Sequence, residues 1–204
     1  MSETSNDRTI KSYNSHIREY LDGTVREVSG TVKEWLDCTF EGVSTDVQIV
    51  ELGSAFGRDA AYLKDKGYHV RCTDATVGFV ELLQKEGYDV DLLNAITDEL
   101  PQGVDIVLAN AVLLHFTRDE ATAVIEKVYG ALSGGGKFAF TLKQGEGEEW
   151  SNDKLGAPRF FTYWTDGQIR KILEDAGYDD IVVWGDRSTG HSTWLQIIAK
   201  KANL

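Results

Sequence analysis

The sequence predicts an α/β fold in which helices cover both faces of a mostly parallel sheet. Three segments share one pattern, in which an amphipathic stretch ends at a Gly-Tyr pair and a β-rich run follows. These pairs are Gly67-Tyr68, Gly87-Tyr88 and Gly177-Tyr178. Glycine ends a helix in the left-handed conformation, after which the chain can enter a strand. Such alternation is typical of a parallel sheet with crossover helices.

Apolar and β-branched runs predict seven strands in this sheet. They are expected at residues 46–51, 68–73, 88–93, 104–109, 136–143, 179–185 and 192–200. The connection between the last two strands, residues 185–191, is too short for a crossover helix, so this pair must form an antiparallel hairpin. Three glycines at 134–136 are expected to separate the preceding helix from the fifth strand.

Apolar residues three and four positions apart predict the helices that cover the sheet. Such faces occur at 79–83, 124–132 and 169–176, and capping boxes that begin at Thr117 and Thr165 mark two helix starts. Two more helices are expected before the first strand, near residues 7–21 and 24–38.

The length and charge of the chain limit its class. Its 204 residues fit a single domain, residues 1–204. A formal net charge of −12 argues against a constitutive nucleic-acid binder, because the phosphate backbone rewards basic surfaces. The only cysteines, Cys38 and Cys72, form no Cys/His cluster, so neither a disulfide framework nor a metal site is indicated. Residues 1–7 are unlike a signal peptide and no run is long enough to span a membrane, so we expect a cytoplasmic protein.

A glycine-containing turn follows the first predicted strand. The apolar run ends in Glu51, passes through Gly53 and Gly57, and opens a helix at Arg58. Glycine lets the backbone turn sharply and approach a ligand, and a helix start presents free N–H groups to it. This arrangement favours a nucleoside-bearing ligand. Tight strand-to-helix turns also use glycine for backbone reasons alone, so the turn by itself leaves a purely structural role open.

Asp74 strengthens the ligand hypothesis because it ends the second predicted strand, about 20 residues past the glycines. A carboxylate in that position binds the ribose hydroxyls in dinucleotide-type folds. The alternative is that Asp74 is a solvated acid that caps the helix beginning at Ala75-Thr76.

Together these features resemble a class I S-adenosylmethionine-dependent methyltransferase with a Rossmann-like fold. The similarity is greatest to small single-domain methyltransferases of the type 11/12 kind, whose first loop reads roughly E-x-G-x-G-x-G-R-D-A. It runs from about Tyr13 to Lys200. The matching segments are the N-terminal helix at 12–20, the fourth strand and its turn at 107–116, the loop at 143–149 and the last helix at 163–178.

The resemblance implies that S-adenosylmethionine is the cofactor, and it implies roles for matching positions. Residues 1–40 would form an N-terminal helical lid over the cofactor. The cofactor-binding residues would be Tyr13, Glu51, Gly53, Ala55, Gly57, Asp74, Ala75, Asn94, Ala95, Asn110 and Ala111. Among them, Glu51 and Gly53 would surround the methionine part, Asp74 the ribose, Asn94 and Ala95 the adenine, and Asn110 and Ala111 the amino-acid end.

Two positions depart from the family pattern. Ala55 stands where the family has its middle glycine, and its methyl group would either crowd the cofactor or be accommodated by an adapted loop. We expect adaptation, because Glu51, Gly53 and Gly57 are retained around it. Asn94 stands where the family more often has aspartate, and its amide oxygen can still accept a hydrogen bond from the adenine amino group.

On the acceptor side, His115 is the candidate general base, because its ordinary pKa near 6.5 suits proton transfer at neutral pH. The alternative is a helix-start histidine bonded to the backbone. His69 and His191 are expected to be structural, and His16 to belong to the lid.

Polar residues after strand five would face the acceptor or form a flexible loop: Lys143, Gln144, Glu146 and Glu149. Nearby aromatic residues would wall the acceptor pocket or anchor this loop: Trp150, Phe160, Phe161, Tyr163 and Trp164. Anchoring is favoured for Phe160 and Phe161.

The function favoured by the sequence is S-adenosylmethionine-dependent methyl transfer to a small-molecule acceptor, by a monomer or homodimer with no membrane partner. A methyltransferase acting on a protein or RNA is the first alternative, and the acidic charge counts against RNA. A module that binds the cofactor without transferring its methyl group is the second, because Ala55 departs from the pattern. A nicotinamide dehydrogenase is disfavoured, since the G-x-G-x-x-G spacing and a second catalytic domain are absent from the sequence.

Overall fold

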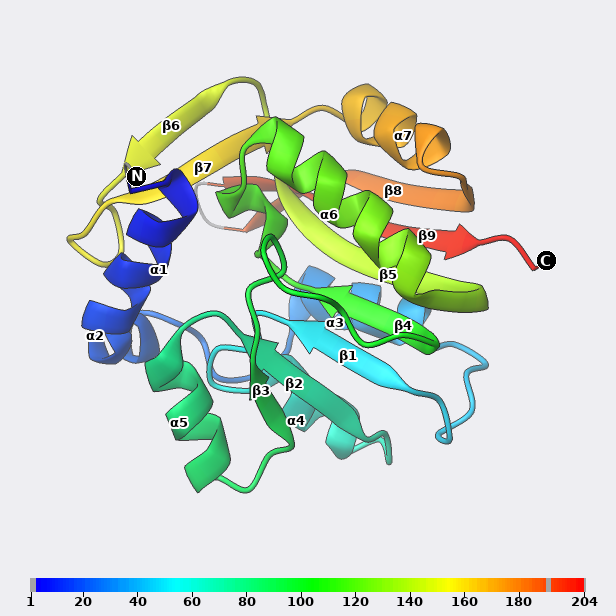
Figure 1. The fold of residues 1–204 in the computed structure, drawn as a ribbon, viewed down its shortest axis with the longest axis horizontal. Helices are drawn as coiled ribbons and strands as arrows, with labels where there is room; N and C mark the ends of the chain where they lie inside the picture. The colour runs from blue at the N-terminus through cyan, green and yellow to red at the C-terminus, as the bar shows by residue number, and fades with distance from the viewer. Residues whose placement is uncertain (1–2, 190–191, 204) are drawn as a thin grey trace.

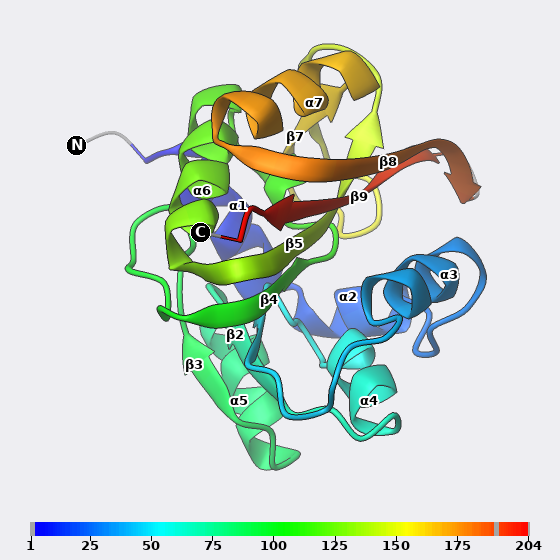
Figure 2. The ribbon, with the colours of Figure 1, turned by 90° about the vertical axis from the view of Figure 1, so that its right-hand side faces the viewer.

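A computed structural model describes residues 3–189 and 192–203, which form one mixed sheet with helices on both sides (Figures 1 and 2). The strands are β1 (Ile49–Leu52), β2 (Val70–Asp74), β3 (Val90–Leu92), β4 (Val104–Ala109), β5 (Leu132–Gln144), β6 (Glu148–Ser151), β7 (Arg159–Trp164), β8 (Tyr178–Thr189) and β9 (Ser192–Lys201). The α-helices are α1 (Ser5–Ser15), α2 (Ile17–Asp22), α3 (Gly30–Thr39), α4 (Arg58–Lys64), α5 (Val77–Lys85), α6 (Arg118–Ala131) and α7 (Asp166–Asp175), and a short 3₁₀ helix, η1, spans Leu113–His115.

The centre of the sheet is parallel, as predicted. Its strands lie in the order β3-β2-β1-β4-β5, and β9 then pairs antiparallel with β5 and with β8. In the registers at the centre, Ile49 lies opposite both Val70 and Ile106. The carboxyl ends of β1, β2 and β4 therefore meet at one edge, which is where ligands bind in sheets of this kind. The fold class and the C-terminal antiparallel hairpin are confirmed.

The prediction of seven strands was wrong in number, because β6 and β7 were missed. They form an antiparallel hairpin, and β7 runs parallel to only the last residues of β5, where Lys143 faces Tyr163 and Gln144 faces Trp164. The sequence of β6 is exposed and lacks alternating apolar residues, so it carries no strand pattern. Phe160 and Phe161 are buried in β7, which confirms that they anchor this segment.

The glycines at 134–136 do not separate α6 from the fifth strand as expected. Strand β5 begins at Leu132, directly after α6, and runs through the three glycines. The register against β4 shifts between Val104 and Ile106, and a side chain on Gly136 would approach the carbonyl oxygen of Asp105 at 3.1 Å. Glycine is needed here so that the irregular strand can lie close to its neighbour.

The N-terminal helices also differ from the prediction. The helix expected at 7–21 is interrupted at His16, whose backbone leaves the helical conformation, with φ −133° and ψ 38°, and whose ring contacts the Ser12 carbonyl oxygen. Helix α3 begins at Gly30 rather than near residue 24. Figure 1 shows α1 and α2 beside the β6–β7 hairpin, whereas Figure 2 shows α3 next to α4.

Two apolar cores hold the layers together. One packs α6 and α7 against one face of the sheet, and the other packs α3, α4 and α5 against the opposite face. Trp35 and Leu36 of α3 are completely buried in the second core, and the Trp35 indole donates a hydrogen bond to the Ile197 carbonyl oxygen. Helix α3 is therefore part of the sheet packing. Within the described residues, no helix is both long enough and apolar enough to span a bilayer.

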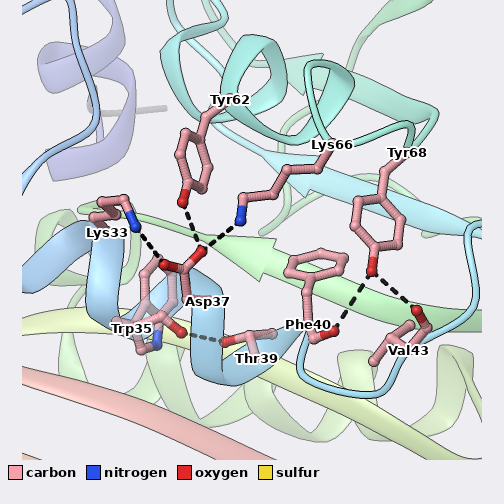
Figure 3. Close-up of polar contacts among 9 residues, drawn as sticks. All are labelled: Lys33, Trp35, Asp37, Thr39, Phe40, Val43, Tyr62, Lys66 and Tyr68. Atoms are coloured by element: carbon pink, nitrogen blue, oxygen red, sulfur yellow. Dashed lines mark hydrogen bonds and ion pairs between the residues drawn. The ribbon is translucent and has the colours of Figure 1, made fainter.

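Asp37 ties α3 to α4, as Figure 3 shows. Its carboxylate accepts hydrogen bonds from Lys33 at 2.6 Å and from the Tyr62 hydroxyl at 2.6 Å, and it pairs with Lys66 at 2.8 Å. These donors hold the pKa of Asp37 well below its ordinary value of 3.8. A carboxylate whose pKa is lowered by folding stabilises the folded state above that ordinary value, and this contribution declines as the pH falls below it.

We expect Asp37→Asn to lower the free energy of unfolding by about 1 kcal/mol at pH 7, because three partly solvated interactions are weakened. The difference from the wild type should shrink as the pH falls below about 4. Urea unfolding at pH 7 and at lower pH measures both effects. Asp175→Asn is the matched control, because its single pair with Lys171 is exposed and its loss should change little. Equal losses in the two variants would contradict the role given to Asp37.

Candidate active site

A cavity of about 100 Å³ lies at the carboxyl ends of the central strands, beneath α1 and α2. The glycine turn after β1 and the turn after β4 form its floor. Its lining residues are Asn6, Thr9, Ile10, Tyr13, Tyr20, Leu52, Gly53, Ala55, Asp74, Ala75, Thr76, Phe79, Leu93, Asn94, Ala95, Asn110, Ala111, Val112, His115 and Phe116. Segments from both halves of the chain thus enclose one space.

The turn between β1 and α4 uses left-handed backbone at three positions: Gly53 at φ +68°, Ala55 at +50° and Gly57 at +77°. A side chain on Gly53 would come within 2.5 Å of Val112, so this glycine lets two cavity turns pack together. Gly57 has a different role. It is the N-cap residue of α4 and packs against Leu83, and it lines no part of the cavity.

Asp74 connects the glycine turn to the start of α5. One carboxylate oxygen accepts a hydrogen bond from the Ala55 N–H at 2.9 Å, and the other accepts one from the Thr76 N–H at 2.8 Å. Burial raises the pKa of Asp74, and these two backbone donors act in the opposite direction. Asp74 therefore caps the start of α5 and faces the cavity at once. It is buried rather than solvated, and its binding of a ribose stays a prediction.

A second, smaller cavity of about 30 Å³ adjoins the first, and Tyr20, Gly53, Ala55 and Asn110 line both. Glu51 faces this smaller cavity and is buried. Desolvation, together with the nearby carboxylate of Asp59, raises the pKa of Glu51 to about 8. A positive charge beside a buried acid with a raised pKa stabilises its ionised form, so this position favours a cationic group of a ligand.

Asp59 organises the same end of the site. It accepts hydrogen bonds from Arg58 at 2.7 Å and from the Asn110 amide at 2.6 Å. The Asn110 amide oxygen in turn accepts a bond from the Thr141 hydroxyl, which itself accepts one from the Ala111 N–H. This chain of bonds fixes the turn after β4, where Ala111 adopts a left-handed φ of +59°.

At the opposite end of the cavity, Asn94 bridges the turn after β3 and helix α1. Its amide oxygen accepts a bond from the Ile96 N–H, and its amide nitrogen donates to the Asn6 side chain at 2.8 Å. Asn6 was missed by the sequence analysis. Its spacing from Tyr13, with Thr9 and Ile10 between, is that of one helix face, and this periodicity is the feature that could have revealed it.

His115 is buried in η1 and held on both sides of its ring. Its Nδ1 lies 2.6 Å from the Phe160 carbonyl oxygen, and its Nε2 lies 2.8 Å from the Tyr13 hydroxyl. The carbonyl requires a proton on Nδ1, so Nε2 accepts a hydrogen bond from Tyr13. Burial lowers the pKa of His115 to about 3. The imidazole is therefore neutral at pH 7, with its one proton on Nδ1 and with Nε2 as an acceptor.

The structure gathers most of the predicted site residues around the cavity. Nine of the eleven cofactor positions line the main cavity, together with His115: Tyr13, Gly53, Ala55, Asp74, Ala75, Asn94, Ala95, Asn110 and Ala111. Glu51 lines the smaller cavity. The polar residues after strand five, including Gln144 and Glu149, line neither cavity. His69 is exposed and precedes β2 at its other end, and His191 lies outside the described residues.

Residues 50–138 match the family described as methyltransferase domain. A search of curated proteins finds no match. The fold is shared with 1,6-didemethyltoxoflavin-N1-methyltransferase from Burkholderia thailandensis, with 17% identity, a TM-score of 0.71, and coverage of 95% of this chain and 85% of that one. It is also shared with magnesium protoporphyrin IX methyltransferase from Synechocystis, with 16% identity, a TM-score of 0.66, and coverage of 99% and 86%.

A third similar structure is phosphoethanolamine N-methyltransferase 2 from Haemonchus contortus, with 14% identity and a TM-score of 0.73. It covers 98% of this chain, which spans 60% of the length of that enzyme. The family match and the shared fold agree: residues 50–138 match a methyltransferase domain, and the fold is that of methyltransferases whose structures contain S-adenosylhomocysteine or S-adenosylmethionine. Among the described residues no cluster of metal-binding side chains occurs.

Asp74→Asn should weaken the binding of S-adenosylhomocysteine by about 2 kcal/mol, because the variant loses its charge-assisted hydrogen bonds. Titration calorimetry measures the affinity, and circular dichroism checks the fold. Asp91→Asn is the matched control, since the half-exposed Asp91 on β3 pairs with Arg71 and does not line the cavity. Unchanged affinity in a folded Asp74 variant would rule out a role in cofactor binding.

Ala55→Gly should raise the free energy of unfolding by up to about 1 kcal/mol. A left-handed φ costs a residue with a Cβ about 1–2 kcal/mol, and the greater unfolded-state freedom of glycine offsets about half of that. Denaturant unfolding measures the gain. Ala61→Gly, in the middle of α4, should instead destabilise the protein by about 1 kcal/mol. A large gain in S-adenosylhomocysteine affinity for Ala55→Gly would show that the methyl group crowds the cofactor.

Proposed function

We propose that the protein transfers the methyl group of S-adenosylmethionine to a small-molecule acceptor. The observation that carries this proposal is the cover over part of the cavity, where the Tyr13 hydroxyl lies 2.8 Å from His115 of η1 and Tyr20 adds a second aromatic ring to the lining. A macromolecular acceptor needs an open approach to the methyl group. The net charge of −12 further disfavours RNA. The similar structures contain 1,6-didemethyltoxoflavin and phosphomonomethylethanolamine, and both are small molecules.

In this proposal the two ends of the site recognise different parts of the cofactor. Asp74 binds the ribose hydroxyls with its remaining lone pairs, and Asn94 and Asn6 contact the adenine edge. Glu51 and Asp59 lie at the methionine end, where these two acids favour the ammonium group and Glu51 ionises as that group binds. Arg58 forms an ion pair with Asp59 and is also available to bind the carboxylate of the cofactor's methionine part.

The chemistry requires little from the protein beyond alignment. S-adenosylmethionine supplies a methyl group on a sulfonium sulfur, and an acceptor lone pair displaces that sulfur in line. The protein positions the acceptor and excludes water. In the proposed role, Nε2 of His115 accepts a hydrogen bond from the acceptor in place of the Tyr13 hydroxyl. Its low pKa makes it a positioning group, and the acceptor proton passes to solvent.

We propose that α1 and α2, residues 5–22, form the movable cover of the site. The cavity volume of about 100 Å³ is below the roughly 300–1,000 Å³ of most small-molecule sites, so the cover must move to make room for a cofactor. Helix α1 suits this movement because its buried residues are polar, namely Asn6, Thr9 and Ser12. Hydrogen bonds hold it rather than a large apolar core. The completely buried Trp35 excludes α3 from the movement.

Binding of S-adenosylhomocysteine at pH 7 should release a proton from Glu51, approaching one per site, because the ligand ammonium lowers the raised pKa of this acid. Calorimetry in buffers with different ionisation enthalpies counts the protons. Glu51→Gln should abolish the release, and the exposed Glu86→Gln should leave it unchanged. If Glu51→Gln still releases the proton, the assignment of Glu51 to the methionine end is wrong.

The acceptor class is tested with cofactor labelled on its methyl group. The purified protein is incubated with an extract of its source organism, which is then separated into low-mass, protein and RNA fractions. We expect the label in the low-mass fraction, and none with Asp74→Asn. Label in protein or RNA would replace the small-molecule proposal with the corresponding alternative. Binding of cofactor without any transfer would favour a non-catalytic module.

A further inference from the structure

A buried arginine lies directly behind the wall of the cavity. Arg159, on β7, is 6% exposed, yet no carboxylate of the described residues lies within ion-pair distance of it. Its guanidinium donates to the Tyr13 hydroxyl at 3.3 Å and to the Asp153 carbonyl oxygen at 2.6 Å. Its buried Nε–H has no partner within the described chain. A buried cation without a counter-ion is costly, so this arrangement calls for an anion.

Two lysines extend the positive charge from Arg159 toward the surface. The ammonium of Lys143, at the end of β5, lies 4.0 Å from the centre of the Phe161 ring, and that of Lys154 lies 4.2 Å from the centre of the Tyr20 ring. Neither lysine forms an ion pair with a described residue. Desolvation and the neighbouring Arg159 lower the pKa values of both, and that of Lys154 to about 8.

These three cations adjoin the acceptor side of the cavity. Arg159 touches Tyr13, Lys154 lies over Tyr20, and both tyrosines line the cavity. The Phe161 ring beneath Lys143 lies 4.7 Å from the His115 ring. Asn94, which is proposed to contact the adenine, lies at the opposite end of the main cavity from His115. The positive charge is therefore placed near the proposed methyl acceptor.

Nearby acidic residues leave this charge uncompensated. Glu149 accepts a hydrogen bond from the Tyr163 hydroxyl at 2.6 Å, and Asp153 contributes only its backbone oxygen to Arg159. Both weakly oppose the lowering of the Lys143 pKa. The chain has 33 acidic and 21 basic residues, so three cations gathered without an ion-pair partner are not a consequence of composition.

We propose that Lys143, Lys154 and Arg159 bind an anionic group on the methyl acceptor, a phosphate monoester or a carboxylate. The inference rests on the proposed small-molecule function and specifies the chemistry of its substrate. The planar guanidinium of Arg159 suits either group, because its N–H donors match two oxygens of one anion. Lys154 is exposed and gives the anion a path from solvent. The acceptor nucleophile then lies on the His115 side, toward the methyl group.

The test titrates inorganic phosphate, and separately acetate, into the protein at constant ionic strength, with and without S-adenosylhomocysteine. The Arg159 Nε–H resonance in ¹H–¹⁵N spectra reports on the group that has no partner. We expect a saturable shift with at least one of the anions. Lys143→Met/Lys154→Met should weaken this binding at least tenfold, because the two ammonium groups are removed. Lys85→Met/Lys171→Met is the matched control, with the same loss of charge on exposed helices, and should bind as the wild type does.

Each result decides one point. Saturation by phosphate alone identifies a phosphate-bearing acceptor, and saturation by acetate alone identifies a carboxylate. Failure of both anions to shift Arg159, or equal weakening in the two double variants, overturns the proposal. S-adenosylhomocysteine affinity is measured in the same samples. If it is retained while anion binding is absent, the cofactor function stands and only the anionic acceptor is wrong. If the cofactor product does not bind at all, the proposed function itself falls.

Discussion

The site depends on the two backbone hydrogen bonds that the Asp74 carboxylate accepts. One comes from the turn after β1 and the other from the start of α5, so a single side chain fixes the relative position of two segments that contact the cavity. Without it, the left-handed turn at Ala55 would lose the acceptor for its N–H. The same carboxylate still has lone pairs directed at the cavity. A group that holds the site together is thus also positioned to hold the ligand.

Much of the fold was predictable because it follows from local patterns. Glycine after a helix, apolar strands and capping boxes each leave a sequence record, and they placed the parallel sheet and its C-terminal hairpin correctly. The family resemblance, in turn, supplied ten of the residues that line the main cavity. The β6–β7 hairpin was not predictable, because Glu148 and Glu149 are exposed and β7 pairs with only two residues of β5. The place of Gly57 at the helix start was predicted. Its packing against Leu83 was hidden, since Leu83 lies 26 residues away in the chain. His115 was located correctly, but its low pKa results from burial, which only the assembled fold reveals.

Charge is divided along the cavity. Carboxylates gather under the glycine turn at Glu51, Asp59 and Asp74, whereas Lys143, Lys154 and Arg159 gather beyond Tyr13 and Tyr20. The two groups act over a short distance in a region of low dielectric, where charges interact more strongly than in water. A cationic cofactor group and an anionic acceptor would each meet the opposite charge. The opposite charges at the two ends would therefore help to place each ligand at its own end of the cavity, in addition to the shape of the cavity.

Helix α1 contacts both ends of the cavity. Asn6 bonds to Asn94 at one end and Tyr13 bonds to His115 at the other, and their separation of seven positions corresponds to about 10 Å of rigid helix. The two contacts must therefore form and break together. The adenosine side cannot be exposed while the acceptor side stays fully formed. One movement of α1 therefore opens both ends of the cavity, and neither end can exchange its contents while the other stays covered.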